Sequence, residues 1–305
     1  MPRRLSVLLL ALAFVGCSSV EPSPGMETGA LSGSIGVLHV ERAEIAAEAD
    51  GHTTLQAAFA RYEGIDGDSV LRLLGSHDAA PLGTCAIVDP AAALPSPELG
   101  TDEADVELVD VGALHVGLLR TGVADTEARL TPRTFPDLAS VLAGVFYAGD
   151  ANLPAPSAGE EVDGEVDEYR FRADGSADVG AFEVIVPAPA APGGVALLGA
   201  DGTYAHLDGR LAEIAPSDQL TLLWDGEDPR DFVEIELSTA GQTLACLARD
   251  EGSFRIPAAD MAMLLEDAAA RLTVRRVRLS PFDAAGMDVA FARVTAARSF
   301  PLSVR

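Results

Sequence analysis

The stretch DQLTLLWDGEDPRDFVEIEL, residues 218–237, contains two runs in which apolar and polar residues alternate. Alternate residues of a β-strand point to the same face of a sheet, so each run predicts a strand with one buried face. The segment between the runs is rich in the Asp, Gly and Pro residues that form turns. The buried positions would be Leu220, Leu222 and Trp224 in the first strand and Val233, Ile235 and Leu237 in the second, with Glu234 and Glu236 outward.

The same alternation predicts two hairpins elsewhere in the chain. Residues 169–173 and 182–186 alternate on either side of Asp174-Gly175, a turn pair that tolerates positive φ. Residues 36–45 and 53–63 can be interpreted in the same way around Asp50-Gly51, although residues 41–49 also have helical propensity. The prediction for the fold class is therefore mainly β and antiparallel.

The last third of the chain predicts two further strands. Val289 and Phe291 begin the final one. The preceding run, residues 272–279, fits a single strand only if one extra residue lies near Arg275 and Arg276, which predicts a β-bulge.

Two segments carry a helical spacing of apolar residues. In residues 257–272, Met261, Leu264, Leu265 and Ala268 recur at i, i+3, i+4 and i+7. Residues 135–149 show a similar stripe, although the Val and Phe residues near its end suit a strand equally well. One or two short helices are therefore expected among the strands.

The proline-rich segment VPAPAAPGG, residues 186–194, predicts a domain boundary, because proline removes backbone donors from a sheet. We expect two β-sandwich-like domains, residues 31–190 and residues 191–305. The second resembles fibronectin type III and immunoglobulin-like modules, on the strands of residues 218–237 and on residues 250–264, read as a strand followed by a short helical crossover. The first domain has no such resemblance and no function that its sequence indicates.

The N-terminus has the three-part layout of an export signal. A basic start, residues 1–4, precedes an apolar run, residues 5–15, which is shorter than the roughly 20 residues that span a bilayer. Gly16 and Cys17 follow. The segment resembles the lipobox of bacterial lipoprotein signal peptides, with Phe14 in place of the usual leucine, and the whole chain resembles two-domain lipoproteins of high-GC Gram-negative bacteria.

The resemblance implies removal of residues 1–16 by cleavage between Gly16 and Cys17, and attachment of acyl chains such as palmitate to Cys17. Two or three acyl chains hold a protein stably on a membrane. Residues 17–30 are rich in Ser, Glu, Pro and Gly and are expected to be a flexible tether. Because Ser18 rather than Asp follows the cysteine, the expected location is the cell envelope, at the outer membrane.

The other two cysteines, Cys85 and Cys246, lie in apolar runs. In an oxidising compartment they can form a disulfide. The alternative is two separate buried thiols, and the sequence favours this alternative because the two residues fall in different predicted domains.

The composition excludes several classes of function. The net charge of −26 argues against nucleic-acid binding, which needs clustered basic residues. All 21 basic residues are arginine, so chemistry that requires a lysine amine, such as Schiff-base formation, is excluded.

No motif in the sequence indicates a catalytic residue, a cofactor site or a metal site. The chain lacks a Gly-x-Ser-x-Gly elbow, a His-Glu-x-x-His helix and a Cys-x-x-Cys pair, and its five histidines have no metal-ligand spacing. Acidic stretches at residues 101–110, 159–168 and 225–231 leave Ca²⁺ open as a cofactor, because carboxylate oxygens are the ligands it prefers. The leading hypothesis is a lipid-anchored, non-enzymatic interaction or structural module with a protein or glycan partner. The alternatives are an exported hydrolase, acting on glycans, with its site in the first domain, and a calcium-rigidified adhesion domain.

Overall fold

The structure is a computed structural model that describes residues 31–45, 51–76, 80–88, 105–119, 126–138, 142–151, 167–199, 202–207, 211–214, 219–226, 228–264 and 268–304. The expected signal segment, residues 1–16, and the expected tether, residues 17–30, lie outside this part of the chain. Within it the protein is mainly β, as predicted, with two short helices.

The elements before the predicted boundary are β1 (Ser32–Ile45), β2 (His52–Glu63), α1 (Gly67–Leu73), β3 (Thr84–Val88), β4 (Asp105–Leu108), β5 (Leu114–Leu119), β6 (Thr126–Leu138), β7 (Leu142–Ala151), β8 (Glu168–Ala173) and β9 (Phe182–Pro187). The elements after it are β10 (Gly193–Gly199), β11 (Tyr204–His206), β12 (Ala212–Ile214), β13 (Leu220–Asp225), β14 (Asp231–Ser238), β15 (Thr243–Arg249), β16 (Ser253–Ile256), α2 (Ala258–Met261), β17 (Ala268–Pro281) and β18 (Val289–Val304).

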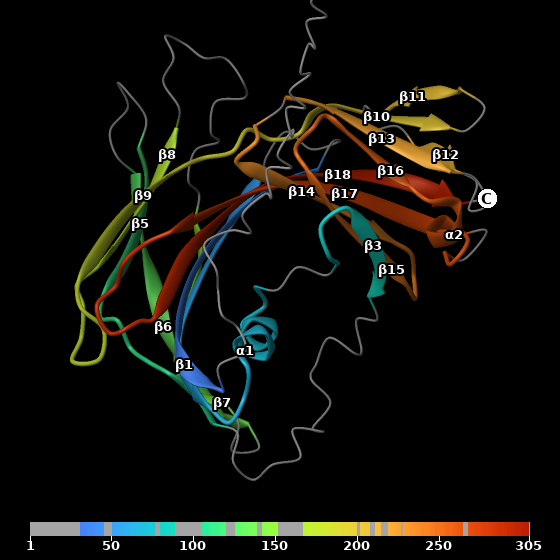
Figure 1. Cartoon of the computed structure of the whole chain (residues 1–305). Helices are drawn as coiled ribbons and strands as arrows, with labels where there is room; N and C mark the ends of the chain where they lie inside the picture. The colour runs from blue at the N-terminus through green and yellow to red at the C-terminus, as the bar shows by residue number, and fades with distance from the viewer. Residues whose placement is uncertain are drawn as a thin grey trace, which may run out of the picture.

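A large mixed sheet forms the body of the protein (Figure 1). Its strand order is β15-β14-β17-β18-β1-β2-β4-β7-β6-β5-β8-β9, and β12 pairs with the end of β18. Most neighbours are antiparallel, whereas β1 and β4 run parallel to β18 and β7, respectively. The sheet is strongly curved in Figure 1, and α1 lies on its inner side.

The centre of this sheet joins the beginning and the end of the described chain. β1 pairs with β18 from Ile35 opposite Val289 to Ile45 opposite Ser299. The boundary expected at residue 190 falls between β9 and β10, and hydrogen-bonded pairing therefore connects strands from both sides of it. A core cluster around Phe59 and Phe171 likewise includes Ala292 from β18.

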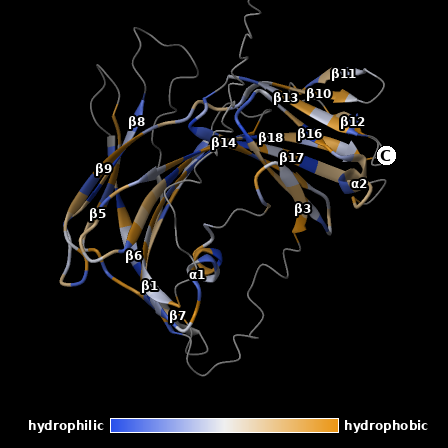
Figure 2. Ribbon diagram, in the orientation of Figure 1, coloured by the Kyte–Doolittle hydropathy of each residue, from blue (hydrophilic) through white to orange (hydrophobic). Residues whose placement is uncertain are grey.

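A second sheet, in the order β11-β10-β13-β16, packs over one end of the large sheet (Figure 1). Leu222 and Trp224 of β13 share a core with Val233 and Ile235 of β14, which lies in the other sheet. The alternation in residues 218–237 thus produces two strands that face each other across a sandwich-like core. Figure 2 shows the same alternation as changes of colour along the strands of both sheets.

Both predicted hairpins are confirmed. β8 and β9 pair antiparallel around a loop in which Gly175 has a φ of 84°. β1 and β2 pair antiparallel over the whole length of β2, from Ser32 opposite Glu63 to Ala43 opposite His52. β18 also begins at Val289, as predicted.

The helix predicted over residues 257–272 is wrong in its extent, whereas for residues 135–149 the strand, one of the two alternatives left open, is confirmed. The segment of residues 257–272 forms only the four-residue α2, and β17 begins at Ala268, because this strand pairs with both β14 and β18. The described residues of the segment 135–149 belong to β6 and β7, which pair with each other. In each case, strand pairing with distant residues overrides the local helical spacing.

The predicted bulge at Arg275 and Arg276 is also wrong. β17 pairs with β14 and with β18 without a register shift. Arg276 therefore points to the same face as Val274, into the sandwich core, where its side chain is 4% exposed and pairs with Asp250. Arg276 thus occupies a regular inward position of the strand as a buried charged residue, and the strand contains no extra residue at this point.

Helix α1 packs on the inner face of the large sheet. Asp66 caps its N-terminus by accepting a hydrogen bond from the backbone N–H of Ser69 at 2.9 Å. Val70 and Leu71 pack against Ile35, Val37 and other apolar residues of β1, β2 and β4. In the described part of the chain, no helix has both the length and the apolar character needed to cross a bilayer.

Candidate functional site

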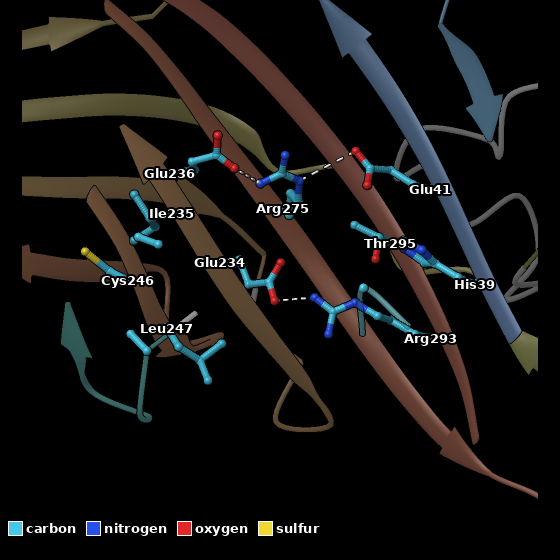
Figure 3. A pocket seen from close by; sticks show the side chains of 13 residues that line it. His39, Glu41, Glu234, Ile235, Glu236, Cys246, Leu247, Arg275, Arg293 and Thr295 are labelled. Atoms are coloured by element: carbon cyan, nitrogen blue, oxygen red, sulfur yellow. Dashed lines mark hydrogen bonds and ion pairs between the residues drawn. The ribbon is translucent and has the colours of Figure 1, made fainter. Parts of the chain in front are cut away.

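A polar cavity of about 270 Å³ lies on the inner face of the large sheet, beside the segment that follows α1 (Figure 3). Its polar walls come from four neighbouring strands: Glu234 and Glu236 of β14, Arg275 of β17, Arg293 and Thr295 of β18, and His39 and Glu41 of β1. Three of the strands contribute two residues that are two positions apart, and β17 contributes one. Residues two apart on a strand point to the same side, so all these side chains lie on one face of the sheet. Glu234 and Glu236 lie on the face predicted to point away from the core, and Gly75 and Ala80, which follow α1, complete the wall of the cavity.

Arg275 is the centre of the first ion-pair group in the cavity. Its Nη1 donates to Glu236 Oε2 at 2.7 Å, and its Nε lies 3.6 Å from Glu41 Oε1. Glu236 also accepts a hydrogen bond from Ser238 Oγ at 2.8 Å. Burial alone would raise the pKa of Glu236, but the Arg275 charge and these hydrogen bonds hold it below its usual value.

Arg293 forms the second ion pair, with Glu234. Both side chains are largely buried, at 9% and 19% exposed, and the two residues lie on strands that are separated by β17. Arg293 also lies directly opposite His39 in the parallel register of β18 and β1. The Arg293 guanidinium therefore binds the Glu234 carboxylate, and the Arg293 backbone lies beside that of His39.

His39 is the histidine of this site. Burial and the nearby Arg293 charge lower its pKa from 6.5 to about 4, although Glu41 acts in the opposite direction. The imidazole is therefore neutral at neutral pH. It carries one N–H donor and one acceptor nitrogen in that state.

The Cys85–Cys246 disulfide lies next to the cavity. Cys246 contributes to the wall, and the bond joins it to Cys85 of β3, with 161 residues of separation in sequence. The interpretation of two separate buried thiols is therefore wrong. The two cysteines meet because β3 runs alongside β15, where Gly83 N–H donates to Leu247 C=O at 2.7 Å.

The other residues considered from sequence lie elsewhere. Gly16 and Cys17 fall outside the described residues. Of the acidic stretch at residues 225–231, Asp228 and Asp231 both bind Arg278, and the charge and hydrogen bonds of Arg230 help to hold the pKa of Asp228 well below its usual value. Across the described residues, no three His, Cys, Asp or Glu side chains gather as metal ligands would.

The sequence gives one local signal of this site, and it is weak. Glu234 and Glu236 alternate with buried residues in the pattern that predicted β14, and such a pattern is also typical of a solvent-exposed face. Nothing local indicates that residues 39–41 lie beside residues 293–295. Parallel pairing of the first and last described strands is a long-range feature that alternation does not encode.

Comparison of the chain with protein-family models and with curated proteins gives no match. The site is therefore interpreted from its own geometry.

Proposed function

We propose that this chain is an exported lipoprotein of the cell envelope, anchored at the outer membrane through acylated Cys17. Its β-structured body then acts as a non-enzymatic binding module. The observation that carries the first part is the disulfide between Cys85 and Cys246. Disulfides persist in oxidising compartments outside the cytoplasm, and the lipobox-like segment before Cys17 provides the corresponding export signal.

The polar cavity supports the second part of the proposal. Its five charged side chains are held by one another in ion pairs on four hydrogen-bonded strands. Groups fixed in this way are preorganised, which lowers the entropic cost of binding a ligand. The resemblance of residues 191–305 to fibronectin type III and immunoglobulin-like modules, which commonly bind partners, is consistent with this role.

The anchor is tested by expressing the full chain in a Gram-negative bacterium and separating soluble from membrane fractions. We expect the protein in the outer-membrane fraction, with an intact mass that corresponds to a chain beginning at Cys17 plus its acyl groups. The Cys17→Ala variant should lose the added mass and leave the membrane fraction.

A variant that carries both Cys85→Ser and Cys246→Ser is the matched control, because it changes cysteines but retains Cys17. It should still carry the lipid. A Cys17→Ala protein that remains membrane-bound, or a wild-type protein without added lipid mass, would refute the proposed anchor.

A further inference from the structure

Two residues that line the cavity each have a buried polar atom without a hydrogen-bond partner among the described residues: Nε2 of His39 and Oγ1 of Thr295. Thr295 is only 2% exposed. The two side chains come from adjacent strands, because Thr295 lies opposite Glu41 in the β1–β18 register, and Figure 3 shows them on the same side of the cavity. Leaving such atoms unpaired costs about 1–3 kcal/mol each, so they mark where a ligand gains most by donating or accepting hydrogen bonds.

The charged groups of the cavity do not offer the same opportunity. Arg275 is engaged by Glu236 and Glu41, and Arg293 by Glu234. An ionic ligand would have to displace one of these pairs. Three carboxylates against two guanidiniums and a neutral imidazole also leave an excess of negative charge, which opposes an anion.

A neutral polyhydroxylated ligand avoids both costs. Each hydroxyl both donates and accepts, so it suits an imidazole nitrogen of either tautomer as well as a threonine hydroxyl. Neighbouring hydroxyls can also reach carboxylate and guanidinium atoms that keep their existing partners, since a carboxylate accepts several hydrogen bonds. Ala80 and Leu247 supply an apolar part of the wall, against which the C–H groups of such a ligand can pack.

The cavity size fits a small member of this class. Ligand pockets usually measure about 300–1,000 Å³, and the polar cavity, at about 270 Å³, lies just below that range. It is therefore suited to a single ring rather than to an extended chain.

We infer that the polar cavity binds a neutral, monosaccharide-sized polyol, whose hydroxyls pair with His39 and Thr295. This inference rests on the proposed binding function of the body and does not depend on the lipid anchor.

The test uses the full chain in a detergent without a sugar headgroup, and measures binding by saturation-transfer NMR and calorimetry. The neutral probes are D-glucose, D-galactose, D-mannose, N-acetyl-D-glucosamine and myo-inositol. The ionic probes are glycine, sodium acetate and methylammonium chloride. We expect saturable binding of at least one neutral probe and none of the ionic probes.

Thr295→Val tests the position of the ligand. It replaces an unpaired buried hydroxyl with a methyl group of similar size, so the fold should be retained. We expect Kd for the bound polyol to rise about three- to tenfold, the value of one lost neutral hydrogen bond, and His39→Leu to cause a loss of similar size. Thr53→Val is the matched control, since Thr53 is also 2% exposed and its hydroxyl has no partner in the described residues, but it does not line the cavity.

Three results would overturn the inference. They are the absence of saturable binding by every neutral probe, preferential binding of an ionic probe, and an unchanged Kd in a folded Thr295→Val protein. Preferential binding of an ionic probe would leave the binding module standing and reject only the ligand class. The fractionation experiment decides the anchor independently of all three.

Discussion

Replacing Asp250 by Asn tests the buried ion pair that holds the sandwich core together. The Asp250 side chain is fully buried, and its Oδ2 lies 2.8 Å from Nε of Arg276, which is itself 4% exposed. Asp250 also accepts hydrogen bonds from Trp224 Nε1 at 2.6 Å and from the backbone N–H of Asp228 at 3.0 Å. All three groups around this carboxylate are donors.

An asparagine in this position has one acceptor oxygen and one NH₂ group. Whichever way the amide is turned, a donor meets a donor, and the Arg276 guanidinium loses its counter-charge. Breaking a buried pair from one side costs about 3–5 kcal/mol. Arg276 retains backbone carbonyl acceptors at Ala190 and Asp225, both at 2.8 Å, so we expect the lower part of that range, about 3 kcal/mol.

Equilibrium urea unfolding measures this loss, and Trp224, the single tryptophan of the chain, provides a local fluorescence signal. With a slope of about 3 kcal/mol/M, a loss of 3 kcal/mol moves the midpoint down by about 1 M. Asp174→Asn is the matched control, because Asp174 is exposed, and such a substitution changes stability by no more than about 0.5 kcal/mol.

Adding Arg276→Met to Asp250→Asn should cost less than the sum of the two single changes, because the second change removes the uncompensated charge. A loss of less than 1 kcal/mol for Asp250→Asn, or simple additivity in the double variant, would refute the coupling between the two residues.

Three further predictions concern other parts of the protein. Burial and the Arg293 charge lower the pKa of His39 from 6.5 to about 4, so the unfolded chain binds more protons than the folded protein between these pH values. The free energy of unfolding should therefore fall as the pH falls, by up to about 1.4 kcal/mol per pH unit. Urea titrations at pH 7 and pH 4 measure this change, and the His39→Gln variant should lack it. Reducing the Cys85–Cys246 disulfide should lower stability by about 2–5 kcal/mol, whereas reductant should not change a variant that carries Cys85→Ser and Cys246→Ser. Gly144 has a φ of 124°, and a Cβ there would lie 2.0 Å from the carbonyl oxygen of Leu108. Gly144→Ala should therefore lower the free energy of unfolding by at least about 2 kcal/mol, measured by thermal unfolding. Gly149→Ala on the same strand is the control and should be nearly neutral, because a Cβ there would lie 4.0 Å from the nearest atom, Leu130 Cα.

Local alternation predicted the strands whose two faces differ in polarity. β13 and β14 follow from residues 218–237, and the β8–β9 hairpin from two alternating runs around a Gly-containing turn. In these elements the side-chain period and the turn residues favour the same structure, so short-range information is sufficient.

The same reasoning failed where a distant partner determines the structure. Residues 257–272 combine alanines with a helical stripe, but from Ala268 onward their backbone pairs with β18, and from Arg271 onward it also pairs with β14. Arg276 looked like a defect in an apolar alternation, because a single sequence does not show that Asp250 and several carbonyl groups surround it. Once those partners are in place, a charge fits the inward position, and no bulge is required.

The polar cavity depends on long-range pairing more than any other feature. Its carboxylates on β14 face Arg275 through an ordinary antiparallel register, whereas His39 and Glu41 reach the same place only because β1 pairs in parallel with β18, about 250 residues later in the chain. Closing so long a loop costs conformational entropy before any contact is made. Burial of apolar residues on both faces of β1, including Val37 and Leu38, offsets that cost. The same pairing places His39 and Glu41, which follow on the same strand, at the cavity. The register that buries Val37 therefore also fixes His39 opposite Arg293, so the packing of the core determines the chemistry of the site.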